Sequence, residues 1–269
     1  IEIAPEFLNT GLHGDRVRVT ITTPKNDRVN GKIDEVLSRA KSGFSGTLEK
    51  ENGSYFLVPT DQKMYTDILI KEESLHGAQA GQKVFVIFKE WIDPTKSPIG
   101  EVSEILGLPG EHNAEMKGIA LEKGFPENFP SDVEREAEKI KEESLDKEKN
   151  ETEVKKRKDF REITTFTIDP IDAKDFDDAI SIKELPNGNV QIGIHIADVS
   201  HYVRPGTALD KEAVKRSTSL YLVDRTIPML PEILSNDLCS LNEQEEKLVF
   251  SAIFTLDNNG TVFERWFGK

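Results

Sequence analysis

Residues 169–178 read Asp169-Pro-Ile-Asp172-Ala-Lys-Asp175-Phe-Asp177-Asp178, which places five carboxylates within ten residues. Anions packed this closely repel one another, so a fold holds them together only at a cost unless a cation neutralises them. Apolar, strand-like runs flank the cluster at 163–168 and 179–182 and predict that it is anchored in a folded core. An anchored cluster of oxygen ligands suits Mg²⁺ or Mn²⁺, and the usual reason to hold Mg²⁺ is chemistry on phosphate.

The spacing of these carboxylates determines how they could share ions. In an extended segment Asp175 and Asp177 would point the same way, with Cα atoms ~7 Å apart, and Asp178 would point away unless the backbone turns. A loop would let them converge, and Asp169, at the end of its strand, could supply an opposing ligand. Because Mg²⁺ takes few carboxylates and keeps several waters, four aspartates favour a site for two ions.

Two other interpretations of these residues stay open. In a calcium-binding EF-hand, acids at the third and fifth positions and a glutamate at the twelfth follow the first aspartate. Neither Asp169 nor Asp175 as the first position gives this pattern, which counts against calcium. The other alternative is an acidic surface loop whose aspartates only form turns.

The composition is that of a globular protein: 269 residues, roughly two domains, of which 36% are hydrophobic. The single cysteine, Cys239, excludes an internal disulfide and fits a reducing compartment. We find no signal peptide and no apolar run long enough to span a bilayer, so we expect a cytoplasmic protein without membrane contact. The net charge of −14 argues against nonspecific coating of DNA. It does not exclude a nucleic-acid enzyme, because a metal site itself contributes aspartates.

An internal repeat relates residues 6–19 to residues 73–86. In both copies Glu, Leu and Gly recur at the same spacing and are followed by a basic residue and a Val-x-Val run. Such self-similarity predicts two copies of one small unit. Strand-like sequence precedes the second copy, whereas the chain starts at the first. We therefore expect the chain to begin inside a domain.

Residues 31–106 have the pattern of an all-β domain. Short β-prone runs alternate with turn residues, and Asn52-Gly53 is a strong hairpin signal. Five strands of this length suit a small closed barrel of the OB type. The expected strands are 31–37, 44–48, 54–58, 68–70 and 83–88.

Residues 107–160 differ in character. Pro126 and Pro130 punctuate the segment, and Ser131 with Glu134 resembles a capping box that starts a helix. Residues 132–161 are rich in Glu, Lys and Arg, which predicts one or two solvated helices that bridge domains. We interpret the basic run 155–158 as a solvated helix end, with a phosphate contact as the alternative.

From residue 163 onward, strands and helices are mixed. The turn sequences at 186–188 and 258–260 predict hairpins, and residues 207–216 predict a short helix. The last strand runs to the C-terminus with nothing after it to cover the sheet, so we expect the chain to be a fragment at both ends. The strands are expected at 163–168, 179–184, 190–197, 219–223, 248–256 and 261–267.

Other residues offer weaker chemistry. His195 lies in an alternating strand and is interpreted as structural, while Asp198 ends that strand and could orient the acidic residues. The cysteine and the histidines lack the spacing of a zinc site, and no glycine-rich phosphate loop is present in the sequence.

Aromatic residues are candidates for stacking on bases. Phe44, Tyr55 and Phe56 fall on expected barrel strands, where OB folds bind single strands. Alternation along a strand places at least one of Tyr55 and Phe56 in the core. Tyr221 lies in an amphipathic run and either faces a groove or is an ordinary half-buried strand tyrosine.

Residues 167–180, Thr-Ile-Asp-Pro-Ile-Asp-Ala-Lys-Asp-Phe-Asp-Asp-Ala-Ile, resemble the signature of the catalytic domain of the ribonuclease II and ribonuclease R family. The resemblance continues through 194–203, 227–231 and 234–241, and the Asp-Phe-Asp-Asp form is similar to that of the bacterial ribonuclease R branch. It implies a multi-domain fold of β and α+β parts, in which cold-shock-type OB barrels precede the N-terminal part of a mixed α/β catalytic domain. The implied domains are the end of a first OB domain at 1–22, a second OB domain at 30–106, a charged helical linker at 107–160 and a truncated catalytic domain at 161–269.

By motif position, the resemblance implies that Mg²⁺, for which Mn²⁺ may substitute, is held by Asp169, Asp175, Asp177 and Asp178, with Asp172 outside the set. Asp169 and Asp178 are expected as direct ligands, Asp175 in the first or second shell, and Asp177 as the catalytic residue nearest the second ion or the attacking water. Tyr221 matches a tyrosine that stacks on nucleotides near the RNA 3′ end.

The reaction that the resemblance implies is processive 3′→5′ exoribonucleolytic hydrolysis of single-stranded RNA to 5′-nucleoside monophosphates. The family's RNA channel implies recognition of the 2′-OH, which separates RNA from DNA. No specific protein partner is expected.

The family's catalytic domain continues beyond the end of this chain, with an arginine-bearing segment and an RNA-binding domain. We therefore expect this chain to bind metal weakly and to turn over RNA poorly or not at all. Two other function classes stay open: a non-catalytic RNA-binding OB module with an inert acidic loop, and a structural protein that interacts through its charged helices. The intact Asp175-Phe-Asp177-Asp178 favours the enzyme, because a binding-only relative could lose such a repulsive cluster cheaply.

Overall fold

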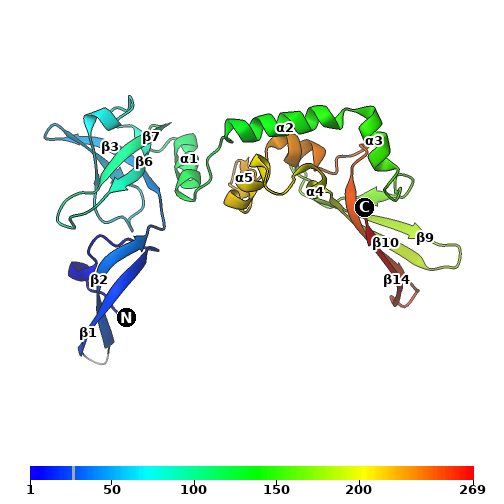
Figure 1. The fold of residues 1–269 in the computed structure, drawn as a ribbon, viewed down its shortest axis with the longest axis horizontal. Coiled ribbons are helices and arrows are strands. Elements are labelled where there is room, and N and C mark those ends of the chain that lie inside the picture. Colours follow the sequence, from blue (N-terminus) through cyan, green and yellow to red (C-terminus); the bar gives the residue numbers. More distant parts are fainter. Residues whose placement is uncertain (26–27) are drawn as a thin grey trace. The chain divides into compact units, whose positions relative to one another are not determined.

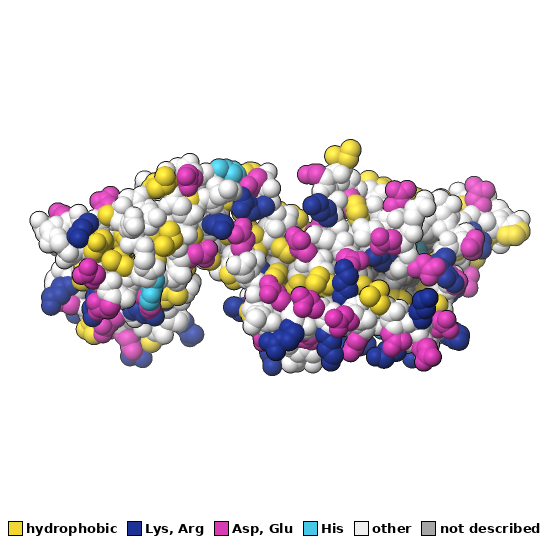
Figure 2. All heavy atoms as spheres, turned by 90° about the horizontal axis from the view of Figure 1, so that it is seen from above, with side chains coloured by type: hydrophobic (Ala, Val, Ile, Leu, Met, Phe, Trp, Pro, Cys, Tyr) yellow, Lys and Arg dark blue, Asp and Glu magenta, His cyan; other side chains and the backbone are white. Residues whose placement is uncertain are grey.

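The computed structural model describes residues 1–25 and 28–269, and the chain divides into two compact units, residues 1–127 and 128–269. Strands dominate the first unit, and the second combines helices with a larger sheet (Figure 1). On the face drawn in Figure 2, acidic and basic side chains are interspersed on both units. Among the helices described, none is long and apolar enough to cross a membrane.

The first unit begins with a short 3-10 turn, η1 (Pro5–Phe7), and a long antiparallel hairpin of β1 (Arg16–Lys25) and β2 (Arg28–Ser38). This hairpin corrects one expectation. Residues 31–37 form a strand, but Gly31 lies opposite Ile21 on β1, so the strand is not part of the barrel. A local strand pattern does not specify the partner strand.

A closed five-stranded barrel, in the order β3-β4-β5-β7-β6, follows this hairpin. Its core is apolar, with Leu48, Leu57 and Ile68 fully buried. The expected hairpin at Asn52-Gly53 is confirmed, and both residues have positive φ, as a type I′ turn requires. The strands are β3 (Gly43–Glu51), β4 (Ser54–Pro59), β5 (Ile68–Ile70), β6 (Lys83–Glu90) and β7 (Ile99–Gly107), of which β7 was not expected.

The sequence repeat has a structural counterpart. In each copy a 3-10 turn, η1 or η2 (Glu72–Ser74), leads through a residue at positive φ to a glycine and then into a strand. Asn9 and Gly14 have φ of 52° and 87° in the first copy, and His76 and Gly81 have φ of 48° and 90° in the second. The two copies therefore share one local backbone path.

The charged segment 107–160 is divided between the two units. Helix α1 (His112–Glu122) packs on the barrel and buries Ala114 and Ala120. Lys83 Nζ on β6 lies 2.6 Å from Glu115 Oε2 on this helix, with the lysine side chain 4% exposed. Apolar and ionic contacts thus attach α1 to the barrel.

The other two helices of this segment belong to the second unit. Helix α2 (Ser131–Ser144) buries Val133 and Ala137 in the core of that unit, and α3 (Lys147–Val154) follows it. The expected capping box is not formed, because Pro130 is the N-cap residue and no side chain caps the helix. The prediction from the sequence did not identify these small residues, which lie among charged ones, as buried.

The second unit is built on an antiparallel sheet in the order β14-β13-β10-β9-β8, with β11 and β12 as a separate hairpin. The main hydrophobic core of this unit contains Leu209, Leu230 and Leu234 together with the buried residues of α2. The expected strands and helix are confirmed, although β8 and β11 are shorter. The elements are β8 (Thr165–Phe166), β9 (Asp178–Glu184), β10 (Val190–Ala197), α4 (Val199–Tyr202), α5 (Ala208–Arg216), β11 (Leu220–Tyr221), β12 (Thr226–Ile227), the π-helical η3 (Ile233–Leu238), β13 (Val249–Leu256) and β14 (Val262–Gly268).

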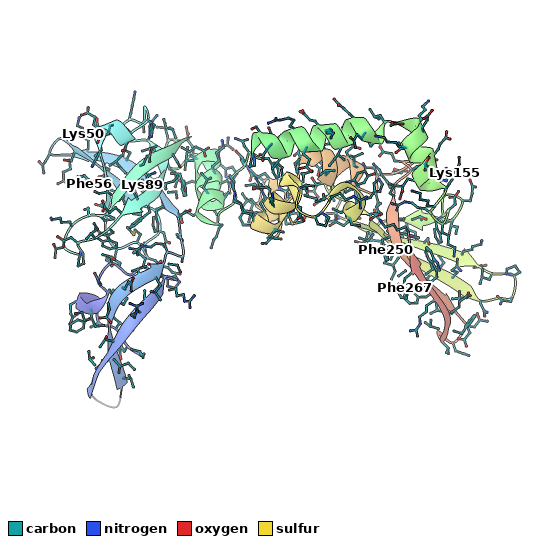
Figure 3. The ribbon with its side chains drawn as sticks, viewed as in Figure 1. Lys50, Phe56, Lys89, Lys155, Phe250 and Phe267 are labelled. Atoms are coloured by element: carbon teal, nitrogen blue, oxygen red, sulfur yellow. The ribbon has the colours of Figure 1, made fainter. Side chains whose placement is uncertain are left out.

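The two faces of this sheet differ in an unusual sense. Its buried face carries Ser181, His195 and Ser251, and the two ring nitrogens of His195 lie 2.8 and 2.7 Å from the two serine hydroxyls. His195 is therefore structural, as expected. Ala179, Ala197 and Ile253 share this buried face. Other large apolar side chains lie on the outer face, where Phe250 and Phe267 lie on this sheet (Figure 3). The outer side chains that remain exposed are Ile182, Ile194, Ile196, Phe250 and Phe267.

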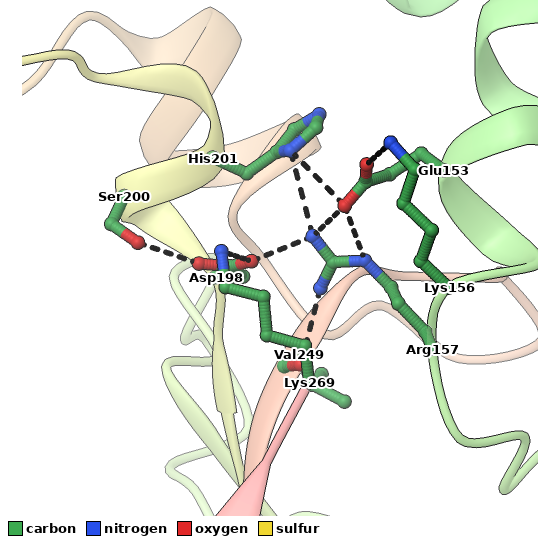
Figure 4. A network of polar contacts seen from close by, with 8 residues as sticks. All are labelled: Glu153, Lys156, Arg157, Asp198, Ser200, His201, Val249 and Lys269. Atoms are coloured by element: carbon green, nitrogen blue, oxygen red, sulfur yellow. Dashed lines mark hydrogen bonds and ion pairs between the residues drawn. The ribbon is translucent and has the colours of Figure 1, made fainter.

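A buried ion pair joins the segment after α3 to the residue that follows β10 (Figure 4). Arg157 donates to Asp198 Oδ2 at 2.7 Å, and the two side chains are 7% and 2% exposed. Burial opposes ionisation of Asp198, but hydrogen bonds from Lys269, Arg157 and Ser200 outweigh it and hold the pKa of Asp198 at about 2. The basic run after α3 is therefore not simply a solvated helix end.

Candidate functional site

The acidic loop, residues 169–178, connects β8 to β9, and its last residue, Asp178, is the first residue of β9. Asp178 lies opposite Ile196 on β10. Asp175 is half-buried, whereas Asp169 and Asp177 are exposed. All four carboxylates expected as ligands therefore lie on one connection at the edge of the sheet.

The two flanks of the loop differ in how they are held. Ala179 and Ser181 on β9 are buried, which confirms an anchor on this side. On the other side, Phe166 and Ile168 are exposed, so the expected apolar anchor is missing there. The loop must obtain the rest of its support from elsewhere in the unit.

That support comes from residues far along the chain. The Ser240 hydroxyl accepts a hydrogen bond of 3.0 Å from the Phe176 N–H and donates one of 2.8 Å to the Lys174 carbonyl. The Leu241 N–H donates to the Phe176 carbonyl at 2.9 Å, and the Ala197 N–H donates to the Asp177 carbonyl at 3.0 Å. The backbone around Asp175 and Asp177 is thus tied to β10 and to the segment after η3.

The carboxylates of the loop act on one another electrostatically. Partial burial and the charges of Asp175, Asp178 and Asp169 together raise the pKa of Asp177 above its ordinary value of 3.8. Desolvation and like charge both disfavour the ionised carboxylate. The loop therefore stores repulsion that a bound cation would relieve.

Tyr221 is brought to the same place from another element. It lies on β11 of the small hairpin, and its hydroxyl donates a hydrogen bond of 2.8 Å to Asp175 Oδ2. The side chain is 64% exposed. The hydrogen bond to Asp175, together with burial, raises the pKa of Tyr221 above 10.0, so the phenol stays protonated at neutral pH. An exposed aromatic ring therefore stands beside the acidic loop.

The donor set suits a hard cation, because it consists of carboxylate oxygens alone. Among the described residues, however, no three His, Cys, Asp or Glu side chains are arranged so that they could hold a metal ion as they stand. Mg²⁺ needs only one or two carboxylates and completes its shell with water. The residues thus fit the ion by kind, and their side chains would have to converge further to bind it.

The barrel aromatics have different surroundings. Phe44 is 3% exposed and packs in the barrel core, so it is not available for stacking on a base. Tyr55 packs partly against the same core, and Lys50 Nζ lies 4.7 Å from the centre of its ring. Phe56 is half-buried on the opposite side of β4, and Figure 3 marks it together with Lys50 and Lys89 on the barrel.

Two features of the site were not predicted from the sequence. Asp198 does not orient the loop through its carboxylate, which contacts Ser200, Arg157 and Lys269. Its neighbour Ala197 holds the loop instead, through a backbone N–H. Ser240 has no local signature of its role, although it lies within the 234–241 block that carried the family resemblance.

Family models match both parts of the chain. A model described as "Cold shock domain" matches residues 56–130, and one described as "RNB domain" matches residues 157–269. Ribonuclease R of Thermotoga maritima is 39% identical over 264 residues, which cover 97% of this chain and 36% of that protein. The chain thus spans little more than a third of the length of this relative.

Solved structures of other proteins share the fold of this chain. RNase R of Mycoplasma genitalium in complex with ribose-methylated single-stranded RNA matches with a TM-score of 0.86 at 27% identity, over 99% of this chain and 42% of that one. Yeast Ssd1, described as a pseudonuclease, matches with a TM-score of 0.64 at 21% identity, over 94% of this chain and 32% of that one. The fold alone therefore does not decide whether a chain cleaves RNA.

Proposed function

Because this chain belongs to the ribonuclease II and ribonuclease R family, we propose that it carries the acidic catalytic loop and an RNA-binding barrel of a Mg²⁺-dependent, processive 3′→5′ exoribonuclease. The observation that carries the proposal is the contact between Tyr221 and Asp175. It puts an exposed ring, able to stack on a base, beside the carboxylates that suit chemistry on phosphate. A nucleotide stacked on Tyr221 would have its phosphate at the acidic loop.

The proposed roles follow from the residues at the loop. Mg²⁺ held by Asp169, Asp175, Asp177 and Asp178 would supply an activated water and stabilise the leaving oxygen of the phosphodiester. Asp177 is proposed, from its position in the motif, as the carboxylate nearest the attacking water, where it could accept a proton. Tyr221 holds the base next to the scissile bond, which fixes the position of the phosphate.

The barrel is proposed to bind single-stranded RNA. Phe56 and the pair of Lys50 and Tyr55 offer a half-exposed ring and a cation, the two groups that hold single strands without sequence preference. Phe44 is left out of this contact because it is buried. The proposed products are 5′-nucleoside monophosphates, with RNA preferred over DNA through its 2′-OH. A cytoplasmic location is part of the proposal and fits the single free thiol, Cys239.

A second candidate is a non-catalytic module that binds single-stranded RNA. Two observations favour it: the described side chains do not close a metal site, and a protein described as a pseudonuclease shares the fold. In this case the acidic loop would be inert and the barrel would carry the function. The two candidates differ in whether the loop binds a divalent cation.

The test combines cleavage with metal binding on the 269-residue chain. A 5′-labelled single-stranded RNA and its DNA counterpart are incubated with Mg²⁺ or with EDTA, and Mn²⁺ binding is followed from the free-ion signal in electron paramagnetic resonance. The matched variants are Asp177→Asn and Asp172→Asn, which remove the same charge from the same loop inside and outside the expected ligand set.

The expected result is Mn²⁺ binding that Asp177→Asn weakens and Asp172→Asn leaves unchanged, with RNA shortened from its 3′ end only in Mg²⁺. Slow turnover by this chain is in keeping with the proposal. RNA binding without any Mn²⁺ binding or shortening would overturn it in favour of the non-catalytic module.

A further inference from the structure

Ser240 occupies a special place behind the acidic loop. Its side chain is fully buried, although no metal ligand or RNA contact is expected from it. The hydroxyl oxygen sits between the carbonyl of Lys174 and the N–H of Phe176, at 2.8 and 3.0 Å. One oxygen atom therefore closes a bridge across Asp175, donating to the residue before it and accepting from the residue after it.

A hydroxyl is the group that this bridge requires. The acidic loop makes no strand pairing before Asp178, so its N–H and C=O groups must find partners elsewhere. Serine offers a donor and an acceptor on one atom, which fits a carbonyl and an N–H two residues apart. The neighbouring Leu241 N–H extends the contact to the Phe176 carbonyl at 2.9 Å.

The support behind Ser240 is rigid. Its own N–H donates to the Asp237 carbonyl, and the Cys239 N–H donates to the carbonyl of Leu234 at 2.8 Å. Leu234 is fully buried in the core with Leu209 and Val133. The hydroxyl is therefore held by η3 and the core, and it in turn holds the loop at Lys174 and Phe176.

We propose that Ser240 is the positioning residue of the acidic loop, which holds Asp175 and Asp177 in place against their mutual repulsion and so presets them for a cation. The use of those carboxylates for a metal rests on the proposed function, but the ordering of the loop by Ser240 does not. Without the hydroxyl, the Phe176 N–H and the Lys174 carbonyl lose their partner. Among the described residues, the repelling aspartates are then held only by the contacts from Leu241, Ala197 and Tyr221. Mutation of residues that orient metal ligands typically weakens metal affinity by about tenfold or more.

The experiment measures loop order and metal binding separately, on the 269-residue chain. Hydrogen–deuterium exchange of peptides covering 169–178 is followed without metal, and Mn²⁺ affinity is followed by electron paramagnetic resonance. The variants are Ser240→Ala and Ser240→Cys, which retains the side-chain volume but replaces the hydroxyl with a weak donor and acceptor. Ser235→Ala is the matched control, since Ser235 lies in η3 and its hydroxyl donates to Asn236 Oδ1.

Both Ser240 variants are expected to raise exchange in 169–178 by about tenfold, while peptides of β13 keep the wild-type rate. Mn²⁺ binding is expected to weaken by roughly tenfold, and Ser235→Ala to match the wild type in both readouts. Wild-type exchange of the loop in Ser240→Cys would overturn the proposal, even if Ser240→Ala fails to fold. If the wild type binds no Mn²⁺, the proposed function fails and the exchange result still decides the role of Ser240.

Discussion

The hydroxyl of Tyr221 donates a hydrogen bond of 2.8 Å to Oδ2 of Asp175, which joins a two-stranded hairpin to a loop 46 residues earlier in the chain. The ring of Tyr221 remains exposed while its polar end is engaged. The two tasks proposed for Tyr221, binding of a base by the ring and positioning of the carboxylate by the hydroxyl, therefore rest on different parts of one side chain.

Replacing Tyr221 by Phe or by Ala should separate these tasks. Tyr221→Phe keeps the ring and should bind single-stranded RNA as tightly as the wild type, while Tyr221→Ala should bind roughly tenfold more weakly because stacking is lost. Fluorescence anisotropy of a labelled RNA without metal measures both. The control is Phe263→Ala, which removes an exposed ring on β14. Equal affinity of Tyr221→Ala and the wild type would rule out a stacking role.

Removing one charge from the acidic loop should stabilise the metal-free chain. The pKa of Asp177 is raised in the folded state, so ionisation of Asp177 costs stability as the pH rises above 3.8. Asp177→Asn should therefore raise the free energy of unfolding at pH 7 by of the order of 0.5 kcal/mol, since the carboxylate is exposed and screened. The gain should vanish in acid, below the ordinary pKa of an aspartate.

Urea unfolding at pH 7 and at pH 3.5 measures this gain, with Asp172→Asn as the control. In a protein that cleaves RNA, the same Asp177→Asn change should abolish cleavage and leave RNA binding intact. Cleavage near the wild-type rate would refute the role given to Asp177.

The ion pair of Arg157 and Asp198 should be among the strongest polar contributions to the second unit. Arg157→Met leaves the buried Asp198 with Lys269 and Ser200 as its remaining side-chain partners, which should cost about 2 kcal/mol of unfolding free energy. Arg161→Met removes exposed ion pairs with Asp159 and Glu246 and should leave the unfolding free energy close to that of the wild type. Urea unfolding followed by circular dichroism compares the two. An equal loss of unfolding free energy in the two variants would contradict the conclusion that the Arg157–Asp198 pair contributes more because it is buried.

The histidine inside the sheet should make stability depend on pH. Burial lowers the pKa of His195 below 6.5, so the unfolded chain takes up its proton first. Stability should be complete above pH 6.5 and fall as the pH drops toward the folded pKa. His195→Gln should reduce this slope in urea unfolding between pH 7.5 and 5. Part of the slope should remain, because burial also lowers the pKa of His201, while Asp198, with a pKa of about 2, responds only in stronger acid.

The positions of strands could be predicted from the sequence more reliably than the pairing of those strands in sheets. The run 31–37 was correctly predicted as a strand, but its pairing with β1 depends on residues that no local pattern encodes. Strand β7 was missed because Glu and Ser interrupt its apolar alternation, although Val102 on it is buried in the barrel. Arg157 was hidden in a basic run, since a run of cations does not say which of them is buried.

The acidic loop was predictable because five aspartates in a short stretch are rare and costly. The structure places it on one connection at the sheet edge and adds Tyr221, which the family resemblance had singled out for another reason. Ser240 could not be predicted, because its two bonds to the loop span 64 and 66 residues. A serine carries no local sign of the partner that it will meet.

The inverted sheet of the second unit has a thermodynamic consequence. Serine, threonine and histidine share its buried face with Ile253 and two alanines, while several isoleucines and phenylalanines already meet water on the outer face. Unfolding this sheet therefore exposes less new apolar surface than unfolding the leucine-rich barrel, and more polar surface, which lowers the heat capacity change. The free energy of the sheet should accordingly curve less with temperature, so that the barrel would be the first of the two to weaken in the cold.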